Sequence, residues 1–152
     1  MKPKEPKFIF LDNIVRCELE DPDTHEIVVG EAKCMPQDMD MMSEKTGGDI
    51  ALYKATIKIL RNKRKRTRQE YRVLKNLLKT YKNRPGFDAT DPYVRILKRK
   101  IYSYSQDIEY LSNCENNCRE ELRKYIDEKD IFYQKIRAMR KRDSNINVTD
   151  LK

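Results

Sequence analysis

The hydrophobic residues of the chain follow two different periods. In the stretch NIVRCELE, the apolar Val15, Cys17 and Leu19 alternate with charged residues. This period of two is typical of a β-strand with one buried face. The turn-forming stretch DPDTHE and the apolar stretch EIVVGEAKC follow. Residues 7–34 are therefore predicted to form a β-hairpin, with residues 8–11 extending its first strand.

From Ile50 onward the hydrophobic period becomes a heptad, with positions named a to g. Apolar residues fill most a and d positions up to residue 81 and again from Val94 to Met139. Such a repeat favours a coiled coil. Between the two series lies RPGFDATDP, in which Asp91 precedes Pro92 as a helix N-cap would. The short connection predicts an antiparallel pair of helices over about 50–83 and 92–141.

The start of the first helix and the ends of the domains follow from these patterns. The stretch MPQDMDMMSEKTGG is predicted to be a loop, with a helix start signal at Thr46 or Asp49. The predicted fold class is α+β, mostly α, with the hairpin packed on a long two-helix coiled coil. The expected units are an acidic head and loop over 1–49, the helical hairpin over 50–142, and a flexible tail over 143–152.

The heptads also predict a register for the two helices. With Tyr81 beside Val94, Ile50 lies near Tyr125 and the seam charges Arg64 and Glu115 come within reach of each other. The register pairs opposite charges at g positions: Lys63 with Asp107, and Glu70 with Lys100. From Lys129 onward the second helix overshoots the first, so Phe132, Ile136 and Met139 need cover from the hairpin or from another chain.

Charge is distributed very unevenly along the chain, although the net charge is only +8. Residues 1–49 hold 6 Lys or Arg against 12 Asp or Glu, whereas residues 50–83 hold 12 against 1. Cations of the first helix gather at heptad positions b and e, beside the seam, in a line about 40 Å long. We call these residues the basic stripe: Lys54, Lys58, Arg61, Lys65, Arg68, Arg72, Lys75, Lys79 and Lys82.

The basic stripe is a candidate polyanion-binding site. Like charges spaced four residues apart destabilise a helix, whereas phosphates would neutralise them and release counterions. Three other interpretations remain: the stripe is a solvated face, the acidic head lies across it, or it meets an acidic protein. Base-specific reading is less well supported, because no zinc finger, RNP motif or helix-turn-helix spacing is present.

Two apolar surfaces are candidate protein interfaces. Val73 and Leu77 lie on the flank of the first helix, toward the connection between the helices, where the hairpin cannot reach. The other surface is on the overshoot of the second helix and comprises Phe132, Tyr133 and Ile136. Either surface could join two copies of the chain or bind a host protein.

Few residues suggest other chemistry. The four cysteines (Cys17, Cys34, Cys114 and Cys118) could in principle hold zinc, but they lack C-x-x-C spacing, so buried free thiols are the default. The only histidine, His25, is expected to be solvated in the hairpin turn. No catalytic motif appears, so neither an enzyme nor a bound cofactor is expected. No apolar run is long enough to span a membrane, and the absence of a secretion signal predicts a reducing cytoplasm.

Two segments carry a family resemblance. VVGEAKCMPQD and GGDIALYKA resemble small uncharacterised proteins of tailed phages and their bacterial hosts, with the patterns G-x-A-x-C-x-P-x-D and G-x-x-[IL]-A-x-x-x-A. The matching residues are Gly30, Ala32, Cys34, Pro36, Asp38, Gly48 through Ala51, and Ala55. The resemblance implies a phage origin and a setting in the host cytoplasm.

The sequence thus predicts a non-enzymatic binding protein that docks on nucleic acid or a nucleoprotein and inhibits a host defence complex, as anti-CRISPR proteins do, or a transcription complex. The alternatives are a structural homo-oligomer and an inhibitor that binds a host protein through an apolar flank.

Overall fold

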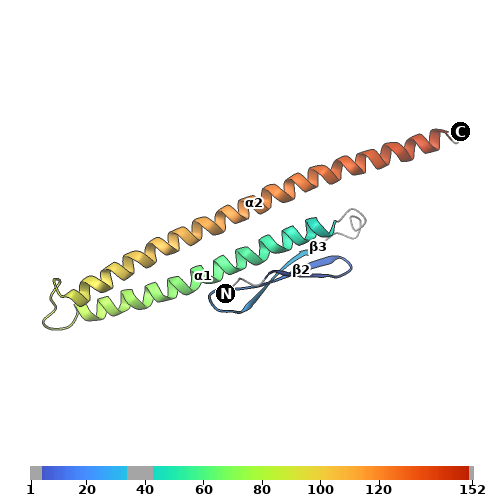
Figure 1. The fold of residues 1–152 in the computed structure, drawn as a ribbon. Helices are drawn as coiled ribbons and strands as arrows, with labels where there is room; N and C mark the ends of the chain where they lie inside the picture. Colours follow the sequence, from blue (N-terminus) through green and yellow to red (C-terminus); the bar gives the residue numbers. More distant parts are fainter. Residues whose placement is uncertain (1–4, 34–42, 151–152) are drawn as a thin grey trace.

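A three-stranded sheet and two long helices make up the described part of the chain. The computed structural model describes residues 5–33 and 43–150, with residues 143–150 as backbone only. The strands are β1 (Lys7–Phe10), β2 (Ile14–Glu20) and β3 (Ile27–Lys33), and the helices are α1 (Glu44–Lys82) and α2 (Pro92–Asp150). Helix α1 lies between the sheet and α2 (Figure 1). The predicted α+β class, mostly helical, and the predicted helical hairpin are both confirmed.

The sheet has one strand more than the predicted hairpin. Residues 7–10 do not extend β2 but form β1, which pairs antiparallel with β2 so that Phe10 lies opposite Val15. The chain reverses over Asp12 and Asn13, where the Leu11 N–H donates to the Ile14 carbonyl at 2.8 Å. Asp and Asn favour turns because their side chains compete with strand hydrogen bonds. The prediction missed this turn because it took residues 8–11 as an extension of the first strand, although Asp12 and Asn13 interrupt the apolar residues.

Alternation in β2 and β3 places one face of the sheet against α1. Val15 and Cys17 are buried in a core with Ala32, Ala51 and Ala55. On the opposite face, Arg16 pairs with Glu31 across the two strands at 2.9 Å. The burial of this core provides the hydrophobic contribution that holds the sheet on α1.

A glycine allows the sheet and α1 to approach closely. A Cβ at Gly30 of β3 would lie 2.2 Å from the Ala51 carbonyl oxygen and 2.5 Å from the Ala55 nitrogen. Only a residue without a side chain fits there. Small residues on both elements therefore fix the side of α1 on which the sheet lies.

Helix α1 begins earlier than the sequence predicted. Its N-cap is Ser43, whose hydroxyl accepts a hydrogen bond from the Thr46 N–H at 3.0 Å. Its first five residues include Gly47 and Gly48, which are buried, and Phe8 of β1 lies beside Gly48. The expected start at Thr46 or Asp49 was therefore wrong, because tertiary packing stabilises a helical turn that glycine would otherwise disfavour. The rest of the predicted loop, residues 35–42, lies outside the described residues.

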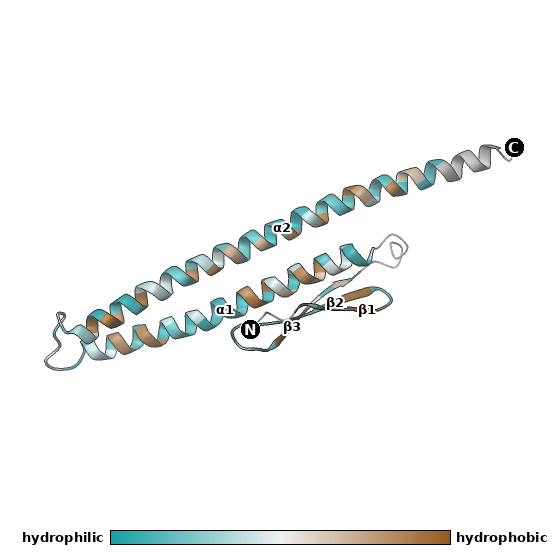
Figure 2. Ribbon diagram, viewed as in Figure 1, coloured by the Kyte–Doolittle hydropathy of each residue, from teal (hydrophilic) through white to brown (hydrophobic). Residues whose placement is uncertain are grey.

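The helical hairpin follows the predicted register. Arg64 Nε lies 3.0 Å from Glu115 Oε2, and the Tyr125 hydroxyl, expected near Ile50, donates to Asp49 at 2.7 Å. Asp91 caps α2 as predicted, since one of its carboxylate oxygens accepts from the Tyr93 N–H. Hydrophobic and hydrophilic residues alternate along both helices (Figure 2). The a and d residues from Ile50 to Tyr125 are buried or half-buried, which is the pattern of a coiled-coil seam.

Helix α2 is longer than predicted and extends past the start of α1 (Figure 1). It continues to Asp150, so residues 143–150, predicted as part of a flexible tail, are helical. The sheet packs on the side of α1 away from α2 and leaves the overshoot uncovered. Phe132 is 55% exposed and Met139 is 60% exposed. Of the two sources of cover considered from the sequence, the β-hairpin is excluded.

Candidate polyanion-binding surface

The basic stripe lies along the solvent-facing edge of α1. Eight of its nine residues are exposed and the ninth, Arg61, is half-buried. Among the described residues, no carboxylate forms an ion pair with any of the nine. The side chains that the sequence placed on one edge are thus brought together and remain available to a partner.

The acidic head neutralises other cations. Asp21 is 1% exposed and lies 3.3 Å from Arg66, and Asp23 lies 3.3 Å from Lys63. Lys63 and Arg66 occupy g and c positions, on the opposite flank of α1 from the stripe. The predicted pairing of Lys63 with Asp107 was wrong, because the turn after β2 reaches Lys63 first. Glu70 and Lys100 line one hollow but no ion pair joins them.

The turn after β2 also positions His25. Its backbone adopts φ 62°, and its Nδ1 lies 3.1 Å from Glu20 Oε1. The ring is exposed, as expected for a turn residue, but it has a carboxylate partner and is not only solvated.

Hydrogen bonds hold two charged side chains in place, Lys58 on α1 and Glu115 in the seam between the helices. Lys58 Nζ donates to the Val29 carbonyl oxygen of β3 at 2.6 Å. In the seam, the buried Glu115 accepts from Arg119 Nη2 at 2.9 Å and is flanked by Arg64, whose Nε–H does not point at the carboxylate. Because two guanidinium groups surround one carboxylate, the local charge of this part of the seam remains positive.

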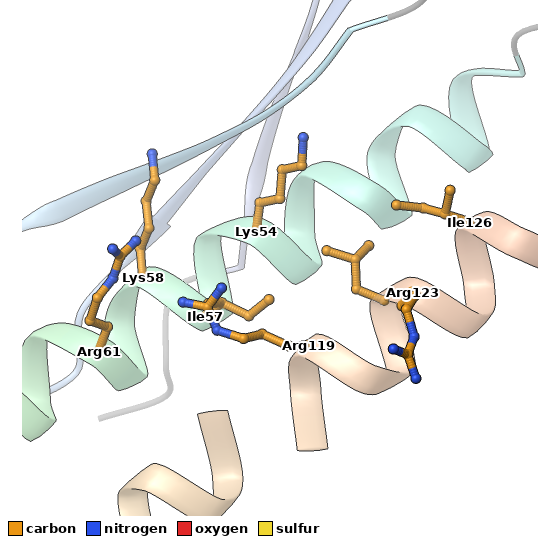
Figure 3. A pocket seen from close by; sticks show the side chains of 8 residues that line it. Lys54, Ile57, Lys58, Arg61, Arg119, Arg123 and Ile126 are labelled. Carbon is orange, nitrogen blue, oxygen red and sulfur yellow. The ribbon is translucent and has the colours of Figure 1, made fainter. Parts of the chain in front are cut away.

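A groove separates the two helices where the stripe approaches the sheet (Figure 3). Its volume is about 420 Å³, and it is open to solvent. Three apolar side chains and five cations line it: Ile57, Leu122, Ile126, Lys54, Lys58, Arg61, Arg119 and Arg123. In Figure 3 the Lys54 and Lys58 head groups extend toward the strands, while Arg119 projects from α2 beside Ile57. The sequence prediction did not include Arg119 and Arg123. Their e and b positions on α2, which place them on the same side of the hairpin as the stripe, were the available signal.

A second hollow lies at the edge of β3. Lys54 and Lys58 line it together with Glu31, Val29 and Lys33. Glu31 accepts hydrogen bonds from both Nε and Nη2 of Arg16, at 3.1 and 2.9 Å. Its charge is thus already partly neutralised on the other face of the sheet, so it reduces the positive potential of the stripe only at its base.

The predicted apolar interfaces are solvent-accessible. Val73 is 65% exposed and Leu77 is 40% exposed, beyond the end of the sheet. On the overshoot, Tyr133 and Ile136 are half-buried beside the exposed Phe132. These residues form two separate patches at opposite ends of the molecule.

The cysteines do not gather in the part of the chain that the structure covers. Cys17 is buried between sheet and α1, where burial raises the pKa of its thiol, and Cys114 and Cys118 lie half-buried on α2. Cys34 lies outside the described residues, so the four-thiolate hypothesis is tested only in part. Within residues 5–33 and 43–142, no three His, Cys, Asp or Glu side chains are arranged to bind a metal ion.

Tyr125 has the most strongly perturbed titration described. Burial, together with the hydrogen bond to Asp49, raises the pKa of its phenol to about 12. The phenol ring also packs against Tyr53 with centroids 5.9 Å apart. Tyr125 therefore holds α2 against the first turns of α1.

Comparisons with known proteins give no relatives. No family model matches the chain, and neither a curated protein nor a solved structure is significantly similar to it. Among the described helices, none is long and apolar enough to cross a lipid bilayer.

Proposed function

We propose that this protein is a non-enzymatic binding protein whose basic stripe docks on the phosphate backbone of nucleic acid, free or within a nucleoprotein. One observation carries the proposal. Nine cations line about 40 Å of one edge of α1 without an ion-pair partner among residues 5–33 and 43–142, while the acidic turn of the same chain pairs with Lys63 and Arg66 instead. Phosphates supply the missing charge, and the release of their counterions favours binding.

The proposal predicts a strong dependence of affinity on salt. If about six of the nine cations contact phosphates, affinity for a 20-nucleotide oligonucleotide should fall about 10³-fold between about 50 and 200 mM KCl. Fluorescence anisotropy with a labelled oligonucleotide measures this. An affinity that is indifferent to salt would contradict the proposal.

Glutamine substitutions test whether the stripe itself is responsible. Changing Arg68, Arg72 and Lys75 to Gln removes three exposed cations from the middle of the stripe. The slope of log affinity against log salt should then decrease in magnitude by about 2 to 3, which is the contribution of three phosphate contacts. The matched control changes Arg99, Lys100 and Lys124, which are exposed on the other side of α2. An equal loss in the control would indicate a general charge effect and not a site.

The biological setting is a further part of this proposal. The phage resemblance of residues 28–38 and 47–55 suggests a host defence or transcription complex, in the host cytoplasm, as the nucleoprotein. A pull-down from host lysate with and without nuclease examines this. Partners that are lost after nuclease treatment are bridged by nucleic acid, whereas partners retained despite nuclease and lost on Val73→Asp and Leu77→Asp would favour binding through the apolar flank.

A second candidate function is self-assembly through the overshoot of α2. The observation in its favour is the exposure of Phe132 and Met139 on a helix that has lost its intramolecular partner. Apolar contacts are nearly insensitive to moderate salt, so an oligomer of this kind should persist at 0.5 M KCl. Salt dependence therefore separates the two candidates.

A further inference from the structure

We infer that the groove between Ile57 and Ile126 holds one unpaired nucleotide, so that the protein prefers single-stranded nucleic acid to a duplex. This inference rests on the proposed function and adds the class of nucleic acid. It is carried by the composition of the groove, which differs from that of the rest of the stripe.

The rim of the groove is built for a phosphate. Arg61 contributes a cation from α1 and Arg119 one from α2, Lys54, Lys58 and Arg123 line the groove with head groups that extend away from its centre (Figure 3), and no acidic side chain lines it. Both helices line this groove with cations. Here a phosphate can be contacted from both sides, which strengthens charge-assisted hydrogen bonds.

The floor of the groove is built for an apolar or aromatic group. Ile57 is buried, and Leu122 and Ile126 are half-buried, between the cationic rims (Figure 3). A volume of about 420 Å³ lies in the range of sites that hold small organic ligands. The sugar-phosphate backbone alone gains little from an apolar floor, whereas a base placed there buries its faces. The planar guanidinium groups beside the floor can also stack on a base.

Base pairing determines whether a nucleic acid can place a base on the apolar floor of the groove. In a duplex each base is stacked and paired, and its extraction costs a few kcal/mol. In a single strand the base is already free to enter. Proteins that bind single strands without base reading combine a positive track with such platforms, as the stripe and groove do together.

Two of the lining cations are held in place by the fold. Lys58 is hydrogen-bonded to the Val29 carbonyl of β3, and Arg119 to the buried Glu115. The ordering of Arg119 before binding reduces the side-chain entropy that a ligand would otherwise have to overcome, whereas Lys58 is held against β3 and adds positive charge near the groove. The groove is therefore expected to bind its nucleotide with a defined orientation.

A comparison of three probes at 50 mM KCl tests the inference. They are a 12-residue thymidine oligonucleotide, an abasic oligonucleotide with the same phosphates, and a 12-base-pair duplex. The wild-type protein should bind the thymidine probe about five- to tenfold more tightly than the abasic probe, because one base occupies the groove. Ile126→Gln, which removes part of the floor without changing charge, should abolish this difference and leave abasic binding unchanged. The control Ile131→Gln makes the same change at an exposed position of α2 outside the groove.

The outcomes distinguish this inference from the proposed function. Equal binding of the thymidine and abasic probes, or tighter binding of the duplex, would overturn the inference and leave the stripe intact as a polyanion site. A retained thymidine preference in Ile126→Gln would also overturn it. Failure to bind any of the three probes would refute the proposed function itself.

Discussion

Replacing Gly30 with alanine should disturb the contact that fixes the sheet on α1. The new Cβ would lie 2.2 Å from the Ala51 carbonyl oxygen and 2.5 Å from the Ala55 nitrogen, distances that real Cβ contacts do not show. Both neighbours are backbone atoms of a regular helix, so neither can rotate away as a flexible side chain could. The strand and the helix would have to move apart by about 1 Å, which forfeits up to about half of the dispersion energy at the nearest contacts.

The expected destabilisation is large for a single methyl group. Overpacking a well-packed core costs about 1 to 3 kcal/mol, and contact with backbone on both sides places Gly30→Ala at about 3 kcal/mol. For a chain of this size, that loss lowers the melting temperature by about 6 to 12 °C. Thermal and urea denaturation followed by circular dichroism measure both quantities.

Two further glycines provide matched Gly→Ala controls with different physical effects. Gly86 has φ 77° and no atom within 4 Å of its would-be Cβ, so its substitution costs about 1 kcal/mol of backbone strain and no clash. At Gly48, in α1, the new Cβ would meet only Phe8 at 3.5 Å, an ordinary contact, so alanine should stabilise the protein by about 0.5 to 1 kcal/mol. If Gly30→Ala is no less stable than Gly86→Ala, the sheet does not lie on α1 at this distance, and the account of the core is wrong.

Two further predictions concern Tyr125 in the seam and the overshoot of α2. The folded state keeps the Tyr125 proton up to a pKa of about 12, whereas an unfolded tyrosine loses it near about pH 10. The contribution of Tyr125 to the stability of the folded state is therefore complete below about pH 10 and decreases toward pH 12. Over this range the urea midpoint of Tyr125→Phe should fall less steeply than that of the wild type. The exposed control Tyr102→Phe should behave as the wild type does. For self-assembly through the overshoot, a Phe132→Asp and Ile136→Asp double variant should sediment as a monomer, while Ile96→Asp, an exposed position on the paired part of α2, should keep the wild-type mass. A wild-type protein that is already monomeric at about 100 µM would rule out this candidate.

Features that depend on periodicity could be predicted from the sequence. The heptads specified the hairpin and its register because each a or d residue must find cover along a rigid helix, so Arg64 and Glu115 were paired correctly. The stripe followed from the same heptads. The position of the sheet could not be predicted in this way, because it depends on a few small residues, Gly30, Ala51 and Ala55, which carry no periodic signal.

Errors in the prediction have the same origin. Asp23 pairs with Lys63 because the sheet, once docked by Gly30, brings its turn to the c and g flank of α1. The sequence gives no sign that Asp23 and Lys63 lie close together. The helix start at Ser43 was missed because two glycines read as loop, although the sheet covers them. The groove needed both helices in place before Arg119 and Arg123 could be recognised beside Lys54.

The cost of the basic stripe to helix stability supports the proposed binding function over a purely structural one. Small residues dock the sheet on one side near the start of α1, the seam packs on α2, and the b and e edge is exposed to solvent along most of the helix. Cations three or four residues apart along this edge repel one another by a few tenths of a kcal/mol per pair, or about 2 kcal/mol in total. A glutamate at alternate positions would remove this cost and keep the helix just as hydrated. The triple glutamine variant at Arg68, Arg72 and Lys75 should therefore be slightly more stable than wild type and yet bind nucleic acid more weakly. If it instead loses stability while binding is unchanged, these cations serve the fold and not a partner.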